Sequence, residues 1–428
     1  MRKLLGAAAV AVIVLGLTAV LASAGTRETV DGASVYYLNF KPEQSSQWNA
    51  LAQAYTRETG VPVTVVTAAS GTYEDALRAE MAKNEPPTLF QVNGPTGLRT
   101  WGSYCLDLRD TALYQNLRSD EFALKDGGKV LAVAYAIETY GLIYNKTLLE
   151  GYCSLENAVI SHPSDIRNFE TLRAVAEDIQ SRREELGVLG AFTSAGMDAS
   201  SDWRFKTHLA NLPLWYEFRE TGDTSSVRGT YLDNYRQIWD LYLNNATCAP
   251  GMIGARTGED AASEFALGEA VFYQNGTWAY QDVIAEGLTD EDLGMLPIYI
   301  GAPGEEAQGL CTGSENYWCI NRRAAPEDIE ATKAFTEWVI TSETGTKMLT
   351  EDMGFVTPFT SMESSVPVNA LQQAAADDLS SGRMPVGWAF TAIPSEDWKN
   401  RVGSALLEYA QGTNGWEPVE TAFTEGWI

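Results

Sequence analysis

The stretch from residue 35 to residue 92 constrains the fold most, because strand and helix patterns alternate along it. Its three apolar, strand-like runs cover residues 35–38, 62–66 and 88–92. Two helical patterns separate these runs, one marked by Trp48, Leu51, Ala52 and Tyr55 and the other by Tyr73, Leu77 and Met81. The order β-α-β-α-β predicts a parallel sheet with helices on its faces.

The loops that follow these strands are candidates for ligand binding. In open α/β sheets, ligands sit in the crevice beyond the carboxyl ends of the strands. The corresponding loops are polar and cover residues 39–47, 69–73 and 93–96. We therefore expect these loops to line a binding site.

Length and charge narrow the class of protein. A chain of 428 residues with 45% apolar content favours two lobes, each with its own core. Neither an internal repeat nor a low-complexity linker divides the chain, so the lobes are expected to interleave in sequence. The formal net charge of -27 would repel nucleic acid and anionic lipid, which argues against both as partners.

The N-terminal 24 residues have the pattern of an export signal. Met1-Arg-Lys3 precedes an apolar run from Leu4 to Ala24, and this run ends in the A-x-A sequence Ala22-Ser-Ala24. We favour cleavage after Ala24, with an uncleaved membrane anchor as the alternative. Either way the protein works outside the cytoplasm, secreted or tethered to the outer face of the cell membrane.

Motifs for common enzyme chemistry are missing from the sequence. It has two histidines and no H-E-x-x-H, G-x-S-x-G, P-loop, G-x-G-x-x-G or C-x-x-C motif, so we expect no metal site and no cofactor. Of the five cysteines, Cys311 and Cys319 are close enough in sequence to bridge across a hairpin.

The segment from Gly128 to Lys146 holds a polar junction between two apolar strand patterns. The junction is Glu138-Thr-Tyr-Gly141, and a buried carboxylate there would need a partner. Two interpretations fit. The junction is either a β-bulge with Glu138 at the surface, or a crossing between two lobes that puts Glu138 and Tyr140 in a cleft.

Aromatic residues in polar loops favour carbohydrate binding. The chain has 12 Trp and 19 Tyr, several of them flanked by Asn, Gln, Asp or Glu. A sugar ring offers an apolar face and a rim of hydroxyls, so its site needs flat aromatic surfaces beside carboxylates and amides. Core packing is the alternative for any single Trp. Paired carboxylates would also suit a secreted glycosidase or lyase.

Three motifs resemble those of the extracellular solute-binding proteins of carbohydrate ABC transporters, the group that includes maltose-binding protein. They are the run Gly128–Lys146, the segment Phe265–Trp278 that resembles F-x-x-G-x-x-A-M-x-x-x-G-x-W, and the strand entry Asn84–Phe90, in which Thr88 replaces the usual acid. The resemblance implies two α/β lobes joined by a hinge, with a sugar held between them and a membrane permease as partner.

The resemblance also implies site residues. Glu138 matches a crossover carboxylate of the group, and Trp278 matches a stacking tryptophan. Trp398 matches a second stacking tryptophan more loosely. Asn93-Gly-Pro95 departs from the group, which has an Asp-Arg pair at this place. Together with the aromatic candidates and their polar neighbours, the predicted ligand-binding residues are Gln47, Trp48, Tyr73, Asn93, Glu138, Tyr140, Asp202, Trp203, Arg204, Trp278, Glu315, Trp318, Trp388 and Trp398.

The expected architecture is a two-lobed, type II periplasmic-binding-protein-like α/β fold. We expect residues 33–139 and 298–325 in the N-terminal lobe and residues 140–297 and 326–428 in the C-terminal lobe. We expect the protein to bind a carbohydrate, in particular an oligosaccharide, by closing its lobes around it. We expect it to act as a monomer and to catalyse no reaction. The alternatives are a secreted carbohydrate-active enzyme or the same fold with a non-sugar solute.

Overall fold

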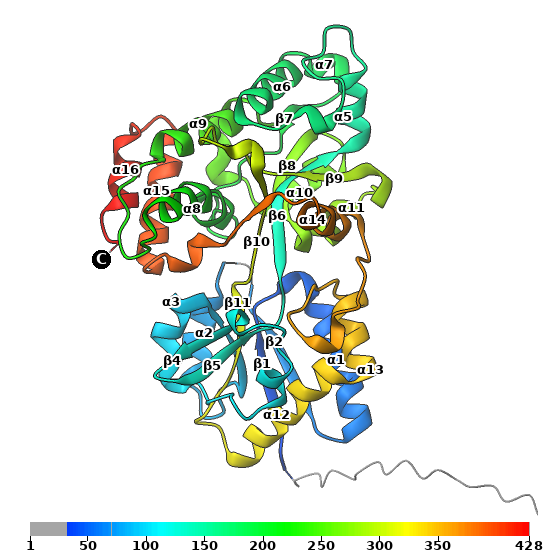
Figure 1. The fold of residues 1–428 in the computed structure, drawn as a ribbon, viewed down its shortest axis with the longest axis vertical. Helices are drawn as coiled ribbons and strands as arrows, with labels where there is room; N and C mark the ends of the chain where they lie inside the picture. Colours follow the sequence, from blue (N-terminus) through cyan, green and yellow to red (C-terminus); the bar gives the residue numbers. More distant parts are fainter. Residues whose placement is uncertain (1–31, 70, 428) are drawn as a thin grey trace, which may run out of the picture.

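The computed structural model describes residues 32–69 and 71–427, which form two α/β lobes stacked end to end (Figure 1). Each lobe is built around one mixed sheet with helices packed on it. The two-lobed fold class is thus as the sequence predicts. The predicted export signal falls within residues 1–31, outside the described residues. In the described part of the chain, no helix is both long and apolar enough to cross a membrane.

The first lobe contains a six-stranded sheet in the order β2-β1-β3-β11-β5-β4. Its strands are β1 (Val35–Asn39), β2 (Val63–Thr67), β3 (Leu89–Asn93), β4 (Ala123–Asp126), β5 (Lys129–Ala134) and β11 (Asn316–Ile320). Its helices are α1 (Ser45–Thr59), α2 (Tyr73–Met81), α3 (Gly94–Trp101), α4 (Ala112–Gln115), α12 (Pro326–Thr341) and α13 (Glu343–Lys347). Strands β1, β2 and β3 are parallel, as the β-α-β-α-β pattern predicts, whereas β11 is antiparallel to its neighbours.

Local sequence explains the boundaries of the first elements. Trp48, Leu51 and Tyr55 form the stripe by which α1 packs into the first core, and each is at most 2% exposed. The helix ends at Gly60, whose φ of +79° is a left-handed conformation that favours glycine. These elements hold the ends of β1 and β3 at one edge of the lobe.

The second lobe contains a sheet in the order β12-β10-β6-β8-β7, with β9 also paired to β6. Its strands are β6 (Glu138–Asn145), β7 (Gly190–Phe192), β8 (Ala270–Gly276), β9 (Leu293–Leu296), β10 (Gln308–Gly313) and β12 (Met384–Val386). Its helices are α5 (Lys146–Cys153), α6 (Phe169–Ser181), α7 (Arg183–Leu186), α8 (Asn211–Thr221), α9 (Leu232–Asn244), α10 (Gly258–Ala266), α11 (Tyr280–Ile284), α14 (Ala370–Ser380), α15 (Glu396–Ala410) and α16 (Glu417–Thr424).

The chain crosses between the lobes where β5 leads into β6, where β10 leads into β11, and again ahead of α14. The first crossing confirms the lobe-crossing interpretation of Glu138–Gly141 and rules out a simple bulge, because β5 and β6 belong to different sheets. Hydrogen bonds join the crossing segments: the Ile137 N–H donates to the Val356 carbonyl at 2.7 Å, and the Ser314 hydroxyl donates to the Ala136 carbonyl at 2.7 Å.

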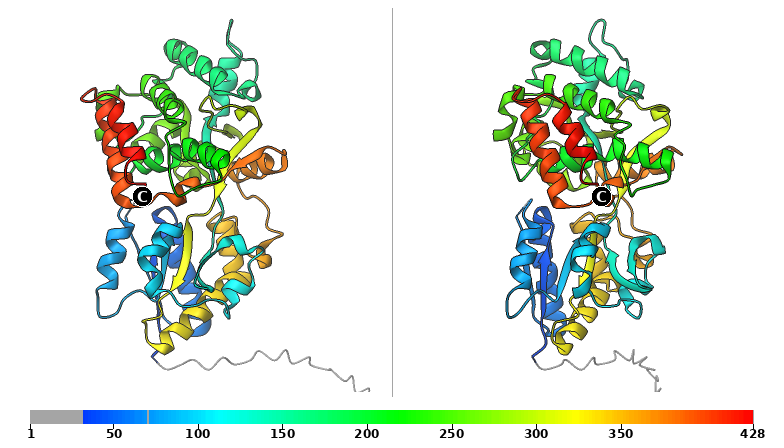
Figure 2. Two further views of the ribbon diagram at one scale, coloured as in Figure 1. Left: turned by 60° about the vertical axis from the view of Figure 1, so that its left-hand side comes forward. Right: turned by 90° about the vertical axis from the view of Figure 1, so that its left-hand side faces the viewer.

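Two of the expected lobe boundaries are wrong. Residues 298–313 lie in the second lobe, because β10 pairs with β6 before the chain crosses back. Residues 326–362 lie in the first lobe, because the apolar stripe of α12, including Phe335 and Val339, covers the first sheet. Figure 2 shows α12 on the lower lobe and the C-terminal helices α15 and α16 on the upper one in both views.

The five cysteines are all unpaired. The suggested bridge between Cys311 and Cys319 does not form, because the crossing between β10 and β11 places the two thiols in different lobes.

Candidate functional site

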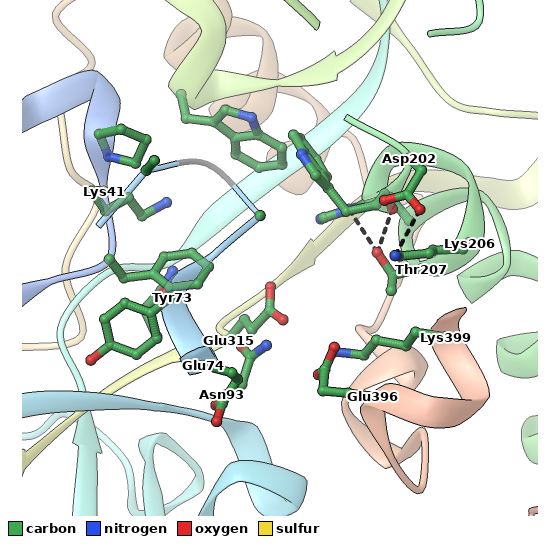
Figure 3. Close-up of a pocket in the computed structure, with 18 of the residues that line it drawn as sticks. Lys41, Tyr73, Glu74, Asn93, Asp202, Lys206, Thr207, Glu315, Glu396 and Lys399 are labelled. Carbon is green, nitrogen blue, oxygen red and sulfur yellow. Dashed lines mark hydrogen bonds and ion pairs between the residues drawn. The ribbon is translucent and has the colours of Figure 1, made fainter. Parts of the chain in front are cut away.

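A cavity of about 200 Å³ lies between the lobes (Figure 3). The first lobe and the crossing supply Phe40, Lys41, Pro42, Glu43, Ala69, Gly71, Tyr73, Glu74, Asn93, Glu138, Glu315 and Asn316. The second lobe supplies Ala199, Asp202, Trp203, Lys206, Thr207, His208, Trp278, Trp388, Glu396 and Lys399.

The walls of the cavity are chain segments that follow regular elements. On the first lobe they are the loop after β1, the loop after β2 with the start of α2, and Asn93 at the end of β3, which fall in or beside the three segments that the strand order indicated. On the second lobe, a π-helical turn over Arg204–Leu209 turns Lys206, Thr207 and His208 toward the cavity. Such turns are rare and are found frequently at functional sites.

Lys41 and Glu138 form an ion pair across the lobes at the floor of the cavity. The Lys41 Nζ lies 2.5 Å from Glu138 Oε1, and the two residues are 4% and 5% exposed. The Asn316 amide donates to the other carboxylate oxygen at 3.3 Å. Burial alone lowers the pKa of Lys41, but the Glu138 and Glu43 carboxylates outweigh it and raise that pKa, so the ammonium stays charged.

Two further lysines are paired within the second lobe. Lys206 Nζ lies 2.7 Å from Asp202, and Lys399 Nζ lies 2.7 Å from Glu396 (Figure 3). Burial raises the pKa of Asp202, and Lys206 opposes this shift. Burial lowers the pKa of Lys399, but the Glu396 and Glu315 carboxylates outweigh this effect, so the pKa is raised overall.

Glu315 and Glu74 bring carboxylates from the first lobe. Burial raises the pKa of Glu315; Lys399 and Lys41 oppose the shift, and Glu396 adds to it. Burial also raises the pKa of Glu74, whose carboxylate accepts from the Trp101 indole at 3.1 Å. The cavity therefore offers acceptors for the hydroxyls of a polar ligand.

Three tryptophans and a histidine form an aromatic wall. The Trp278 ring centroid lies 6.1 Å from that of Trp203 and 6.4 Å from that of Trp388, and Lys41 Nζ lies 5.6 Å from the Trp278 centroid. His208 packs against all three rings. Burial lowers the pKa of His208 to about 3, so the imidazole is neutral and acts as a further aromatic surface.

The structure brings eight of the predicted residues together on the cavity wall: Tyr73, Asn93, Glu138, Asp202, Trp203, Trp278, Glu315 and Trp388. Tyr140 lies behind them, fully buried, with its hydroxyl donating to the His208 carbonyl at 2.8 Å.

Five predicted residues lie elsewhere. Trp48 and Trp318 are in the core of the first lobe and Trp398 is in that of the second, each with no exposed surface. Gln47 is on α1 outside the cavity, and Arg204 points into the second lobe, 2% exposed. The three tryptophans were wrong choices because their side chains complete apolar cores.

Sequence reasoning missed the three lysines and His208. Lys41 was inside a predicted loop, which was a usable signal, but its partner Glu138 is 97 residues away. Lys206 and His208 stand in a charged segment that a solvated helix face would also explain.

Comparisons with known proteins agree with this architecture. A family model described as bacterial extracellular solute-binding protein matches residues 50–376. The melibiose/raffinose/stachyose-binding protein MelE of Bacillus subtilis is 26% identical over 265 residues, which is 60% of this chain and 58% of that protein. This chain thus aligns with little more than half the length of that curated relative.

Solved structures show the same fold. A sugar transporter of Bacillus licheniformis in complex with stachyose has a TM-score of 0.68 at 19% identity, covering 91% of this chain and 98% of that one. The GacH receptor of Streptomyces glaucescens has a TM-score of 0.66 at 18% identity, covering 91% and 95%. At these sequence identities, the similarity shows a shared fold and nothing more specific.

Proposed function

The chain belongs to the bacterial extracellular solute-binding protein family, and we propose that it captures a carbohydrate between its lobes and delivers it to an ABC transporter permease. We propose that this carbohydrate is an oligosaccharide. The family consists of binding proteins that act outside the cytoplasm. We further propose that this chain works as a monomer, secreted or tethered to the outer face of the membrane.

The main support for the proposal is that an aromatic wall and carboxylate acceptors line the same cavity. Trp278, Trp203 and Trp388 supply flat apolar surfaces, and Glu138, Asp202 and Glu315 supply carboxylate oxygens in the same cavity. A pyranose ring needs both, because its C–H face packs on an aromatic ring while its hydroxyls need polar partners. The names of the relatives, which include raffinose and stachyose, support the same ligand class.

The lobes touch at two points, which supports a clamp in its closed state. The Thr96 hydroxyl of α3 donates to the Ile393 carbonyl at 2.6 Å. A Cβ on Gly71 would lie 2.8 Å from the Ala199 carbonyl oxygen of the other lobe. A ligand that contacts both lobes only when they are closed would shift the population toward this state.

Trp278→Ala tests the proposal by isothermal calorimetry with raffinose and with stachyose. We expect the variant to bind the sugar about tenfold or more weakly, because stacking surface is lost at the centre of the cavity. Trp215→Ala is the matched control, since Trp215 is also partly buried in the second lobe but lies outside the cavity.

Two results would count against the proposal. Equal affinities of wild type and Trp278→Ala would remove the aromatic wall from the site. Cleavage of the sugars during incubation, followed by chromatography, would support instead the carbohydrate-active enzyme that the sequence also allows.

A further inference from the structure

Two of the five cysteines lie together in the core of the first lobe. Cys319 is on β11, an inner strand of the sheet, and Cys105 follows the short turn Gly102–Tyr104 at the end of α3. Both belong to one apolar cluster, in which Cys319 is 0% and Cys105 3% exposed. The sequence suggested Cys311 as the partner of Cys319, but the fold brings Cys105 to that place instead.

Backbone pairing fixes the two cysteines beside each other. Residues 104–106 run antiparallel to residues 320–322 just beyond the end of β11, and Cys105 forms an isolated bridge with Asn321. Two backbone hydrogen bonds, of 2.9 and 2.8 Å, flank this bridge. Cys319 is two residues from Asn321, so its side chain leaves the strand on the same face. The pairing therefore directs both thiols into the same part of the core.

The two thiols are in contact. The side chains of Cys319 and Cys105 form a hydrogen bond, and the Cys105 thiol also donates to the Trp101 carbonyl at 3.4 Å. Cysteines can be bridged where their backbones are close and their side chains point toward each other, and this pair meets both conditions.

The compartment decides what such a pair becomes. The family acts outside the cytoplasm, where disulfides form and persist. We propose that Cys105 and Cys319 are joined by a disulfide bond in the exported protein. In a reducing compartment, the same two residues would stay thiols that only fill space in the core. The proposal is independent of any sugar, because neither cysteine lines the cavity between the lobes.

The oxidation needs an external disulfide, which outside the cytoplasm belongs to a protein or a small thiol compound. One cysteine thiolate attacks this disulfide, forms a mixed disulfide with it and releases one thiol. The second cysteine then attacks the sulfur of the first and releases the other thiol. The protein thus loses two electrons and two protons, and the external disulfide gains them as two thiols.

The bond has to form before the first lobe is completely folded. Burial raises the pKa of the Cys319 thiol well above its usual range, and the neighbouring Cys105 raises it further. Since the thiolate is the reactive form, the folded pair of thiols is protected from oxidation.

The bond connects two stretches of sequence that build the first lobe. One stretch precedes β6 and the other begins with β11, and the chain between them builds much of the second lobe. A disulfide stabilises a protein mainly by restricting the unfolded chain, and this effect grows with the length of the loop that it closes. The bond should therefore stabilise the first lobe strongly.

Peptide mapping of protein exported to a bacterial periplasm tests the bond directly. The protein is denatured in urea with N-ethylmaleimide and without reductant, and is then digested with trypsin and chymotrypsin. Chymotrypsin cleaves after Tyr317 and Trp318 and so separates Cys319 from Cys311. We expect a linked pair of peptides that contain Cys105 and Cys319 and lack the label. Label on both cysteines, or a bond from either one to another cysteine, would overturn the proposal.

Thermal unfolding tests the role of the bond. The exported protein is compared with the same protein after reduction in urea and refolding with dithiothreitol, and its unfolding midpoint should be higher by about 5 °C or more. Cys105→Ala should lose this difference. Cys311→Ala should keep it, because Cys311 is an equally buried cysteine in the second lobe. Equal midpoints for the oxidised and reduced wild type would overturn the stabilising role.

Discussion

Replacing Lys41 by Met is expected to destabilise the protein strongly, because it removes one partner of a buried ion pair. The Lys41 and Glu138 side chains are almost inaccessible, and their charged atoms are 2.5 Å apart. Without Lys41, the Asn316 amide at 3.3 Å is the one side-chain partner that the described residues leave to the Glu138 carboxylate. Breaking such a pair from one side costs about 3–5 kcal/mol.

The two single variants should differ in cost. In Glu138→Gln, the Lys41 ammonium still has Glu43 at 3.6 Å as a second partner. In Lys41→Met, the carboxylate has no second cation in ion-pair distance within residues 32–69 and 71–427, so this variant should be the less stable of the two. The double variant removes both charges and should be more stable than Lys41→Met alone.

Urea unfolding, followed by tryptophan fluorescence and by far-UV circular dichroism, measures these free energies, and coincidence of the two signals checks two-state behaviour. Lys333→Met serves as the control, because its pair with Glu330 is exposed and should contribute less than about 1 kcal/mol. The reasoning fails if Lys41→Met is no more costly than Lys333→Met, or if the double variant is less stable than Lys41→Met.

Three further predictions follow from the cavity. Gly71→Ala should weaken raffinose binding about tenfold, because a Cβ at this position would meet Ala199 of the other lobe. Gly60→Ala is the control, because both glycines have φ near +75° but Gly60 has no atom of the other lobe beside it. Calorimetry on the two variants measures the difference. Burial raises the pKa of Glu315 in the folded protein, so the charged carboxylate opposes folding at pH values above its unfolded pKa, and this cost is absent at lower pH, where the group is protonated in both states. Glu315→Gln should therefore raise the thermal midpoint of the free protein at pH 7 and leave it unchanged at pH 3.5; an equal shift at both values would contradict the assignment. Since burial lowers the pKa of His208 to about 3, its NMR resonances should not titrate between pH 5 and pH 8.

Much of the first lobe could be read from the sequence, because its information is local. The stripe Trp48, Leu51 and Tyr55 already indicated a helix packed on a sheet, and α1 has that form. The same stripe also indicated that Trp48 belongs to the core. Assigning it to the sugar site gave too much weight to residue type and too little to periodicity.

The second half of the chain was harder because its placement depends on long-range pairing. Whether β10 belongs to one lobe or the other is decided by its bonds to β6, about 170 residues away. The inter-lobe cavity gathers Lys41, Lys206 and Lys399 from three separate segments, and no spacing in the sequence links Lys41 to Lys399. Residue type alone could not find the site in either case.

The distribution of charge around the cavity bears on how the clamp works. Two of its three lysine pairs, at Lys206 and Lys399, join partners within the second lobe. Closure brings Glu315 and Glu74 of the first lobe toward both members of the Lys399 pair: Glu396 repels the two carboxylates, and Lys399 attracts them. Burial is the largest effect on both and raises the pKa of each, which means that the closed cavity removes water from these carboxylates. A ligand whose hydroxyls donate to them would replace that water, so the same groups that bind the ligand also make closure depend on it.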